Sequence, residues 1–192
     1  MKNQLLKFTV IICNLLKIVY VVSALAITFF FIHLQINKEF YTDKNIQINF
    51  KQKHGEFNIS WDDKWGDSIS KNDKEVFTLK NLTPFSLYFN YIKTILILGL
   101  LFIMTLEFKK ILNSVNSLKT FEKDNIISFR KIGKYLLIYF IVTSYYVFRF
   151  KEGSTSSLDI NLTPLLLIFL CFILSEIFKE GNSLKQENEL TI

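Results

Sequence analysis

Long apolar blocks alternate with polar stretches along this chain, and the four longest blocks contain no Asp, Glu, Lys or Arg. A helix needs about 20 apolar residues to cross a hydrocarbon core of about 30 Å. Extended to ends that approach this length, the blocks predict four transmembrane helices, at 8–34, 85–106, 132–150 and 162–178.

The composition favours a membrane protein over a soluble one. Half of the 192 residues are hydrophobic, and 20 of them are Phe. A soluble fold would have to cover four apolar blocks with a polar shell, and the remaining sequence is too short to supply it. We therefore expect an all-α integral membrane protein with four transmembrane helices and a small β-containing extracytoplasmic loop, forming a single four-helix domain over 1–192.

The first apolar block begins like a secretory signal. A basic start leads into an apolar run, and Ala24-Leu25-Ala26 fits the small-x-small pattern of a cleavage site. However, the apolar run continues through Ile32, and Lys17 interrupts the part that would form the core of a signal. We expect the segment to remain in the protein as its first transmembrane helix.

Loop charges predict the orientation. The stretch 107–134 carries seven basic and three acidic residues, whereas the long loop 35–87 carries eight of each. Because positive charge in short loops marks the cytoplasmic side, we expect both termini, the loop 107–131 and the tail 179–192 to be cytoplasmic. The loop 35–87 and the short connection 149–159 would then lie outside, and the net charge of +6 reflects topology rather than nucleic-acid binding.

The outer loop contains a period-two pattern. Apolar residues alternate with polar ones at Ile46, Ile48 and Phe50, and again from Phe57 to Trp61, with a turn predicted between the two runs. The run 74–80 offers a third strand. Two interpretations stay open for this small sheet, a structural cap or a ligand-sensing face, and Trp61 and Trp65 suit a membrane interface.

The tetrapeptide Asn-Leu-Thr-Pro occurs twice, at 81–84 and 161–164. Thr is a favoured N-cap, and Pro is favoured at the first helical position. Each copy therefore predicts a helix that begins at its Pro.

Charged residues within the predicted spans are candidate intramembrane polar sites: Lys17, Lys93 and Glu176. Such charges are costly in a bilayer and often functional. Lys17 and Lys93 lie near enough to a span end to extend their amines to the headgroups, and Glu176 lies at the inner end of the fourth span. A permease path around Lys17, Lys93 and Asn90 is the alternative.

Catalytic and metal-binding patterns are absent from the sequence. Cys13 and Cys171 fall in separate apolar blocks, and His33 and His54 lack neighbouring ligands. There is no glycine-rich phosphate loop and no nucleophile elbow. We expect a protein that is not an enzyme and uses no cofactor.

Two polar blocks adjoin the apolar segments on the side predicted to be cytoplasmic. Residues 120–133 read as an amphipathic helix that leads into the third span. In the block 176–192, Gly181 fits a helix end, and the acidic tail is expected to fold back onto the basic loop. The two blocks would pack together, with Leu184, Leu190 and Ile192 buried against Phe121, Ile126 or Phe129.

These two blocks resemble the bacterial membrane family known as domain of unknown function 2975. The first block matches at Thr120, Phe121, Asn125, Phe129, Arg130, Ile132 and Gly133, with Thr120 and Phe129 departing from the usual Pro and Leu. The second matches at Phe178, Gly181, Leu184, Glu187, Asn188, Leu190, Thr191 and Ile192. The resemblance implies a four-span protein of the bacterial cytoplasmic membrane, and it implies by analogy a cytosolic helix-turn-helix partner.

We therefore expect a multi-pass membrane protein that serves as a non-enzymatic regulatory or docking partner of a cytosolic protein. Besides the lipid bilayer and that partner, a homo-oligomer is left open, and direct binding of nucleic acid is not expected. A small permease or channel subunit is the alternative. The candidate cytoplasmic recognition surface consists of Phe121, Asn125, Arg130, Lys131, Gly133, Phe178, Gly181, Leu184, Glu187, Asn188, Leu190 and Thr191.

Overall fold

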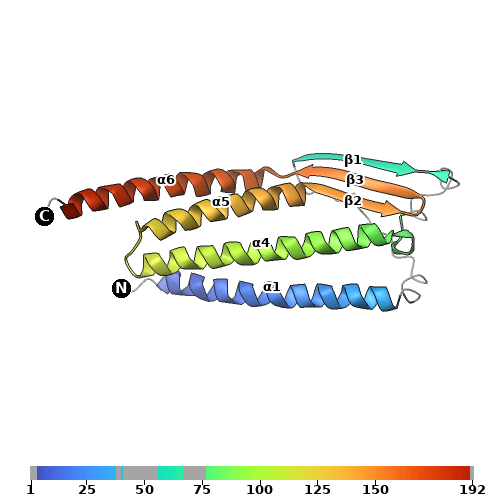
Figure 1. The fold of residues 1–192 in the computed structure, drawn as a ribbon, viewed down its shortest axis with the longest axis horizontal. Helices are drawn as coiled ribbons and strands as arrows, with labels where there is room; N and C mark the ends of the chain where they lie inside the picture. Colours follow the sequence, from blue (N-terminus) through green and yellow to red (C-terminus); the bar gives the residue numbers. More distant parts are fainter. Residues whose placement is uncertain (1–3, 38–39, 41–55, 67–76, 191–192) are drawn as a thin grey trace. The chain divides into compact units, whose positions relative to one another are not determined.

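A computed structural model describes residues 4–37, 40, 56–66 and 77–190. This part of the chain is mostly helical and includes a small three-stranded sheet (Figure 1). Its elements, in chain order, are α1 (Gln4–Ile36), β1 (Phe57–Lys64), the short 3₁₀ helix η2 (Leu79–Asn81), α4 (Pro84–Asn116), α5 (Lys123–Ser144), β2 (Tyr145–Phe150), β3 (Gly153–Ile160) and α6 (Leu162–Leu190).

The chain divides into two compact units, which are described separately. The helical unit contains Met1–Val22, Leu98–Phe140 and Thr163–Ile192. The sheet unit contains Ser23–Ile97 and Ile141–Leu162.

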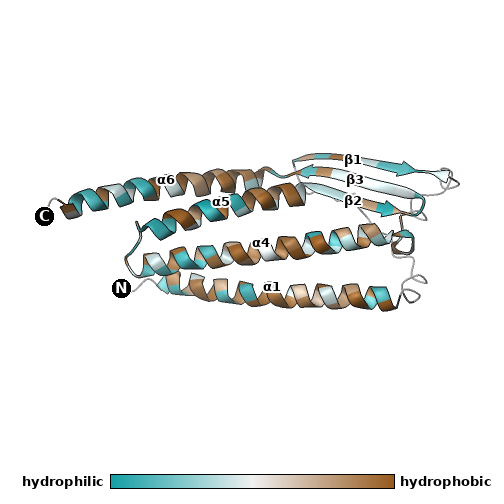
Figure 2. Ribbon diagram, in the orientation of Figure 1, coloured by the Kyte–Doolittle hydropathy of each residue, from teal (hydrophilic) through white to brown (hydrophobic). Residues whose placement is uncertain are grey.

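Two of the four helices, α1 and α6, meet the length and hydropathy that a membrane span requires, in the part of the chain that the structure describes. Their sides are largely exposed, as expected for helices that face lipid rather than a protein core. Figure 2 shows that α6 is mostly apolar near its start and increasingly polar towards its C-terminus.

The apolar blocks located the helices, although the helix limits differ from the limits predicted for the spans. α4 continues ten residues past the predicted end at 106, to Asn116, so the expected loop 107–131 is mostly helical. α5 ends at Ser144, and 145–150 forms a strand rather than the end of a span. Tyr, Val and Phe, which dominate this stretch, favour a strand once a partner strand is available.

The two Asn-Leu-Thr-Pro copies begin helices in different ways. At the first copy, Thr83 is the N-cap of α4: its Oγ1 accepts the N–H of Ser86 at 3.4 Å, and Pro84 is the first helical residue, as predicted. At the second copy, the prediction is wrong because α6 already begins at Leu162. The N–H of Leu162 donates to the carboxylate of Glu56 at 2.8 Å, so a residue far earlier in the chain satisfies the first N–H of this helix.

The sheet has the strand order β1-β3-β2, and both pairs are antiparallel. Only β1 comes from the predicted outer loop, because the other two strands form a hairpin over the predicted connection 149–159 and the residues beside it. The predicted strand around Ile46–Phe50 lies outside the described residues. The described part of the third predicted run, 77–80, forms no strand.

Each unit has a small buried core. In the helical unit, Ile111, Phe129 and Ile132 are buried together, with Leu174 and Phe178 packed against them. In the sheet unit, Phe77 and Phe150 form a buried pair whose ring centroids are 5.2 Å apart.

Candidate functional site at the start of α5

The connection between α4 and α5 is a tight turn that fixes the start of α5. α4 ends at Asn116, and Leu118, two residues later, lies in the left-handed region at a φ of 62°. Lys119 N–H donates to Ser114 O at 2.9 Å and Leu118 N–H to Val115 O at 3.1 Å, the two bonds of a Schellman motif. This position normally favours glycine, and the Leu118 side chain is 92% exposed.

Asn125 ties this turn to the first turn of α5. Its side chain is almost fully buried, and its Nδ2 donates to Ser114 Oγ at 2.9 Å, Lys119 O at 3.1 Å and Thr120 O at 2.7 Å. One amide thus joins the end of α4, the turn and α5. Asn125 belongs to the predicted recognition surface. In the structure its side chain is buried, and its hydrogen bonds hold the turn together.

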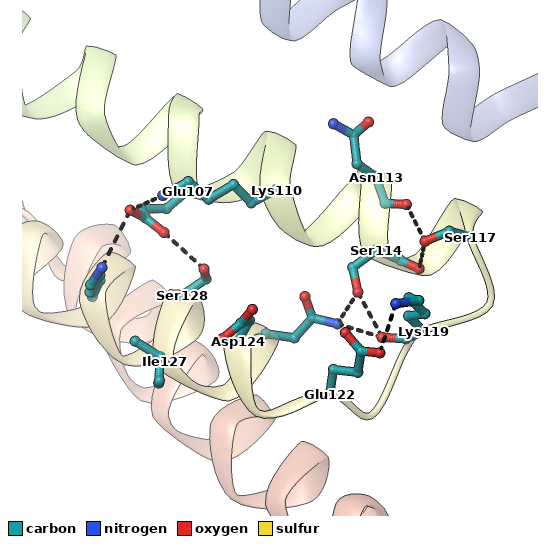
Figure 3. A pocket seen from close by; sticks show the side chains of 12 residues that line it. Glu107, Lys110, Asn113, Ser114, Ser117, Lys119, Glu122, Asp124, Ile127 and Ser128 are labelled. Carbon is teal, nitrogen blue, oxygen red and sulfur yellow. Dashed lines mark hydrogen bonds and ion pairs between the residues drawn. The ribbon is translucent and has the colours of Figure 1, made fainter.

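Glu107 is a buried carboxylate about two and a half helical turns before the end of α4. Its Oε2 accepts the hydroxyl of Ser128 at 2.8 Å, and its Oε1 lies 2.8 Å from Lys110 Nζ and 3.7 Å from Lys131 Nζ (Figure 3). Burial by itself raises the pKa of this carboxyl, but the bonds from Lys110 and Ser128 and the two lysine charges outweigh it and lower the pKa below its ordinary value. Glu107 therefore stays ionised and links α4 to α5.

A polar cleft of about 490 Å³ lies between the end of α4 and the start of α5 (Figure 3). Its charges compensate one another, because three lysines and three carboxylates line it and Lys119 lies 3.4 Å from Glu122. The described residues contain no group of three or more His, Cys, Asp and Glu that could hold a metal ion. The cleft can accept a polar group by hydrogen bonding.

We predict that Glu107 makes stability depend on pH in the acidic range. A carboxyl whose pKa is lowered by folding stabilises the fold above its ordinary pKa of 4.5, and this contribution is lost as the pH falls through the folded value. Glu107→Gln should therefore cost about 1–3 kcal/mol of unfolding free energy at pH 7. The difference from the wild type should shrink towards zero as the pH falls well below 4.5.

Thermal unfolding in detergent micelles between neutral and acidic pH measures this difference. Glu122→Gln, which removes an exposed ion pair with Lys119, is the matched control and should change stability by less than about 1 kcal/mol. A constant difference between Glu107→Gln and the wild type at every pH would contradict the assignment.

The two resembling blocks come together in the helical unit. Phe178 of α6 lies against Phe121 and Phe129, with ring centroids 5.5 Å and 4.9 Å away. The side chain of Asn182 donates a hydrogen bond to the carbonyl of Phe121. Further along, Arg130 contacts Ser175 Oγ at 3.0 Å and Glu176 Oε1 at 2.7 Å.

Two glycines permit this close packing. A Cβ at Gly181 would lie 2.6 Å from Cε1 of Phe121, and a Cβ at Gly133 would lie 3.2 Å from the ring of Phe172. The prediction of a helix end at Gly181 is wrong, because α6 continues to Leu190. Because glycine has no Cβ, Gly181 instead lets the ring of Phe121 approach the backbone of α6 closely.

The expected burial of the tail leucines is also wrong. Leu184 and Leu190 are 60% and 87% exposed, because α6 runs on as a helix instead of folding back. Glu187 and Asn188 are exposed on the same part of α6, and Thr191 and Ile192 lie outside the described residues. The packing between the blocks thus depends on Phe178, Gly181 and Asn182.

The predicted recognition surface is therefore divided between two sides of α5. Asn125 and Lys131 line the cleft towards α4, whereas Phe121, Arg130 and Gly133 meet α6. Phe121 also lines an apolar groove along α6, together with Ile173, Ile177, Gly181, Leu184, Phe172, Glu176 and Glu180.

In the sheet unit, Lys93 has a structural role. Ser86, Asn90 and Lys93 follow one another along one side of α4, at spacings of four and three residues. Lys93 Nζ donates to Tyr145 O at 2.5 Å and lies 3.6 Å from the ring centroid of Tyr146. Asn90 Nδ2 donates to Val147 O at 3.2 Å, and Ser86 Oγ accepts the N–H of Arg149 at 3.2 Å.

The residues before α4 complete this arrangement. Thr83 donates its N–H and its hydroxyl to Arg149 O, both at 3.0 Å, and Asn81 O accepts the N–H of Lys151 at 2.8 Å. Because β2 lies at an edge of the sheet, these bonds occupy backbone groups that an edge strand leaves open. Lys17 lies half-buried in the helical unit, whereas Lys93 belongs to the sheet unit.

Sequence reasoning missed the polar stripe of α4 and the Glu107 cluster. The helical spacing of Ser86, Asn90 and Lys93 was a readable signal, since polar residues at spacings of three and four share one face. Glu107 and Lys110 are three residues apart and therefore also share one face of α4. Their partner Ser128 lies on another helix, and no local pattern identifies it.

Together, these features describe a helical protein with two helices apolar enough to cross a membrane, a small sheet, and a buried polar junction at the start of α5. Residues 74–192, more than half of the chain, match the family described as Protein of unknown function (DUF2975), and the chain belongs to that family. No curated protein and no solved structure matches the chain.

Proposed function

We propose that this protein is a non-enzymatic four-span membrane protein whose cytoplasmic end docks a cytosolic protein. α4 and α5 would cross the bilayer together with α1 and α6, since α4 contains the uncharged apolar stretch 94–106 and α5 contains 135–144, the helical part of the third uncharged block. Both termini would be cytoplasmic, because the basic residues concentrate in 107–134. The bacterial cytoplasmic membrane is the expected location.

The observation that carries the proposal is the exposed end of α6. Beyond its apolar part, α6 stays helical through Leu190 and is held against Phe121 by Phe178 and Asn182. It nevertheless exposes Leu184 and Leu190, which add little to the packing of the described fold. Apolar side chains on a rigid helix outside the lipid are typical of a docking surface.

The alternative of a permease or channel subunit has less support. Asn90 and Lys93, two of the three residues expected around a path, bond to backbone carbonyls of β2. Polar groups committed to the fold in this way are poorly suited to exchange partners with a moving substrate.

Crosslinking in native membranes tests the docking role. A photoreactive amino acid at Lys185 would capture the partner, and the double substitution of Leu184→Asp and Leu190→Asp should reduce the yield of that crosslink about tenfold or more. Leu118→Asp is the control, because Leu118 is also an exposed leucine and lies at the α4–α5 turn. An unchanged crosslink in the double variant would contradict docking at the end of α6.

A further inference from the structure

One face of the β1–β3 pair is lined by polar side chains. Side chains alternate between the two faces of a sheet, and the register brings three polar residues of β1 opposite three polar residues of β3 on the same face. We call these six residues the polar sheet face. Its pairs are Asn58 with Asp159, Ser60 with Ser157, and Asp62 with Thr155.

The polar sheet face is covered along β3 and open along β1. β3 lies between β1 and β2 (Figure 1), and its Asp159 and Thr155 are 9% and 5% exposed. On β1, Ser60 and Asp62 are exposed and Asn58 is half-buried. A small molecule can therefore approach Asp159 from the side of β1.

The carboxylate of Asp159 lacks the partner that a buried acid requires. Its Oδ1 is buried, and no hydrogen-bond donor in the part of the chain that the structure describes reaches it. An unpartnered buried acceptor is costly, and a charged one is more so. Lys93, a buried cation of the same unit, donates to Tyr145 O instead. A donor from outside the chain would satisfy this oxygen.

The oxygen atoms around Asp159 match a primary ammonium group. Asn58 lies directly opposite, where Cβ atoms are about 5 Å apart, and Ser157 is two residues away along β3, at about 7 Å. Together these residues offer a carboxylate, an amide oxygen and a hydroxyl. A primary ammonium carries three N–H donors and a single positive charge, so it matches these acceptors in number and in charge.

A divalent metal ion fits this face less well. Ca²⁺ takes about six to eight oxygen ligands, several of them usually carboxylates. The second carboxylate of the face, Asp62, lies opposite Thr155, four residues along β3 from Asp159, or about 13 Å. That distance is too long for the two acids to share one ion. Asp159 alone would balance only half of the charge of a divalent ion.

We propose that the polar sheet face binds the primary ammonium group of a small organic amine, with Asp159 Oδ1, Asn58 Oδ1 and Ser157 Oγ as its acceptors. The ammonium enters over β1, and the organic part of the ligand stays at the exposed side, near Ser60. The small sheet then serves as a ligand-sensing face as well as a cap. All of these residues belong to the sheet unit, so the inference is independent of the proposed docking function.

Ligand-observed NMR on the full chain in nonionic micelles tests this site. The probe is ethylammonium, and tetramethylammonium, which has the same charge but no N–H, is the matched probe. Ethylammonium should bind at least about tenfold more tightly than tetramethylammonium, because its N–H groups form charge-assisted hydrogen bonds.

Substitutions place the binding on the polar sheet face. Asp159→Asn keeps the shape of the side chain but removes its charge, and it should weaken ethylammonium binding by about tenfold or more. Asp63→Asn is the matched control, because Asp63 is an exposed carboxylate on the opposite face of β1 and should leave binding within about twofold of the wild type. If Asp159→Asn fails to fold, Asn58→Ala removes another acceptor and should weaken binding by about threefold or more.

Three outcomes would overturn the inference. The first is the absence of saturable ethylammonium binding to the wild type, or equal binding to the wild type and Asp159→Asn. The second is equal binding of the two probes, which would mean that the site recognises charge without N–H donors. The third is displacement of ethylammonium by equimolar Ca²⁺, which would assign the site to a metal ion.

Discussion

Truncation of Phe150 to alanine should destabilise the sheet unit by about 3–5 kcal/mol, the largest effect that we expect from a single substitution. The ring of Phe150 is 1% exposed and packs on Phe77, Leu82 and Phe148. Its removal leaves a cavity at the end of β2, in a small core with few other apolar contacts. Chemical denaturation in micelles, followed by tryptophan fluorescence, measures this loss because both tryptophans lie in the sheet unit.

Phe57→Ala is the matched control for Phe150→Ala. Phe57 belongs to the same sheet and is 61% exposed, so its truncation should change stability by less than about 0.5 kcal/mol. Similar losses in the two variants would show that the pair of Phe77 and Phe150 is not the core of the sheet unit.

Replacement of Asn125 by alanine should destabilise the helical unit by about 2–3 kcal/mol. The change removes three hydrogen bonds and leaves buried acceptors around the α4–α5 turn without a donor. Asn125→Asp should be at least as harmful, because a carboxylate of the same shape would face three oxygen atoms. Amide hydrogen exchange is the sensitive measurement, since Lys119 N–H and Asn125 N–H are both bonded within this turn.

Lys123→Ala, at an exposed position two residues earlier, provides the comparison for Asn125 and should leave the exchange rates of 117–126 within about twofold of the wild type. If Asn125→Ala leaves those amides as protected as before, the turn is held by the Schellman bonds alone. The buried amide would then need another explanation.

The helices were predictable because length and the absence of charge are strong signals. The helix α6 shows the limit of these signals: its apolar block predicts a span end near 178, and Gly181 fits a helix end just beyond it. Glycine has two uses in a helix, to end it or to admit a neighbouring group. The choice depends on Phe121, which lies sixty residues earlier.

The β2–β3 hairpin was missed for a similar reason. The run from Tyr145 to Phe148 is apolar and directly follows a helix, so its sequence alone fits either a continued helix or a strand. Its partner β3 is rich in Ser and has few apolar residues, and it becomes a strand because it pairs on both sides. β1, by contrast, was predictable from its own alternation.

The candidate site was predictable only in part. Resemblance to the family identified Asn125 and Phe178 as residues of interest, but their partners Ser114 and Phe129 became apparent only in the fold. Glu107 lies next to a span end, where a carboxylate is usually read as a surface charge. Its burial depends on Ser128, which α5 supplies.

The order of the strands has a consequence for biogenesis. The contacts at either end of the β1–β3 ladder join residues 86 and 106 positions apart, so β1 leaves the ribosome long before β3. At about 5–20 residues per second, the delay lasts on the order of 4–20 s. Under the proposed topology, β1 would cross the membrane during that interval without the strand that later pairs with it. α4, however, is already complete when β2 emerges, so its polar stripe can serve as a template that receives the hairpin, and β1 can join the sheet last.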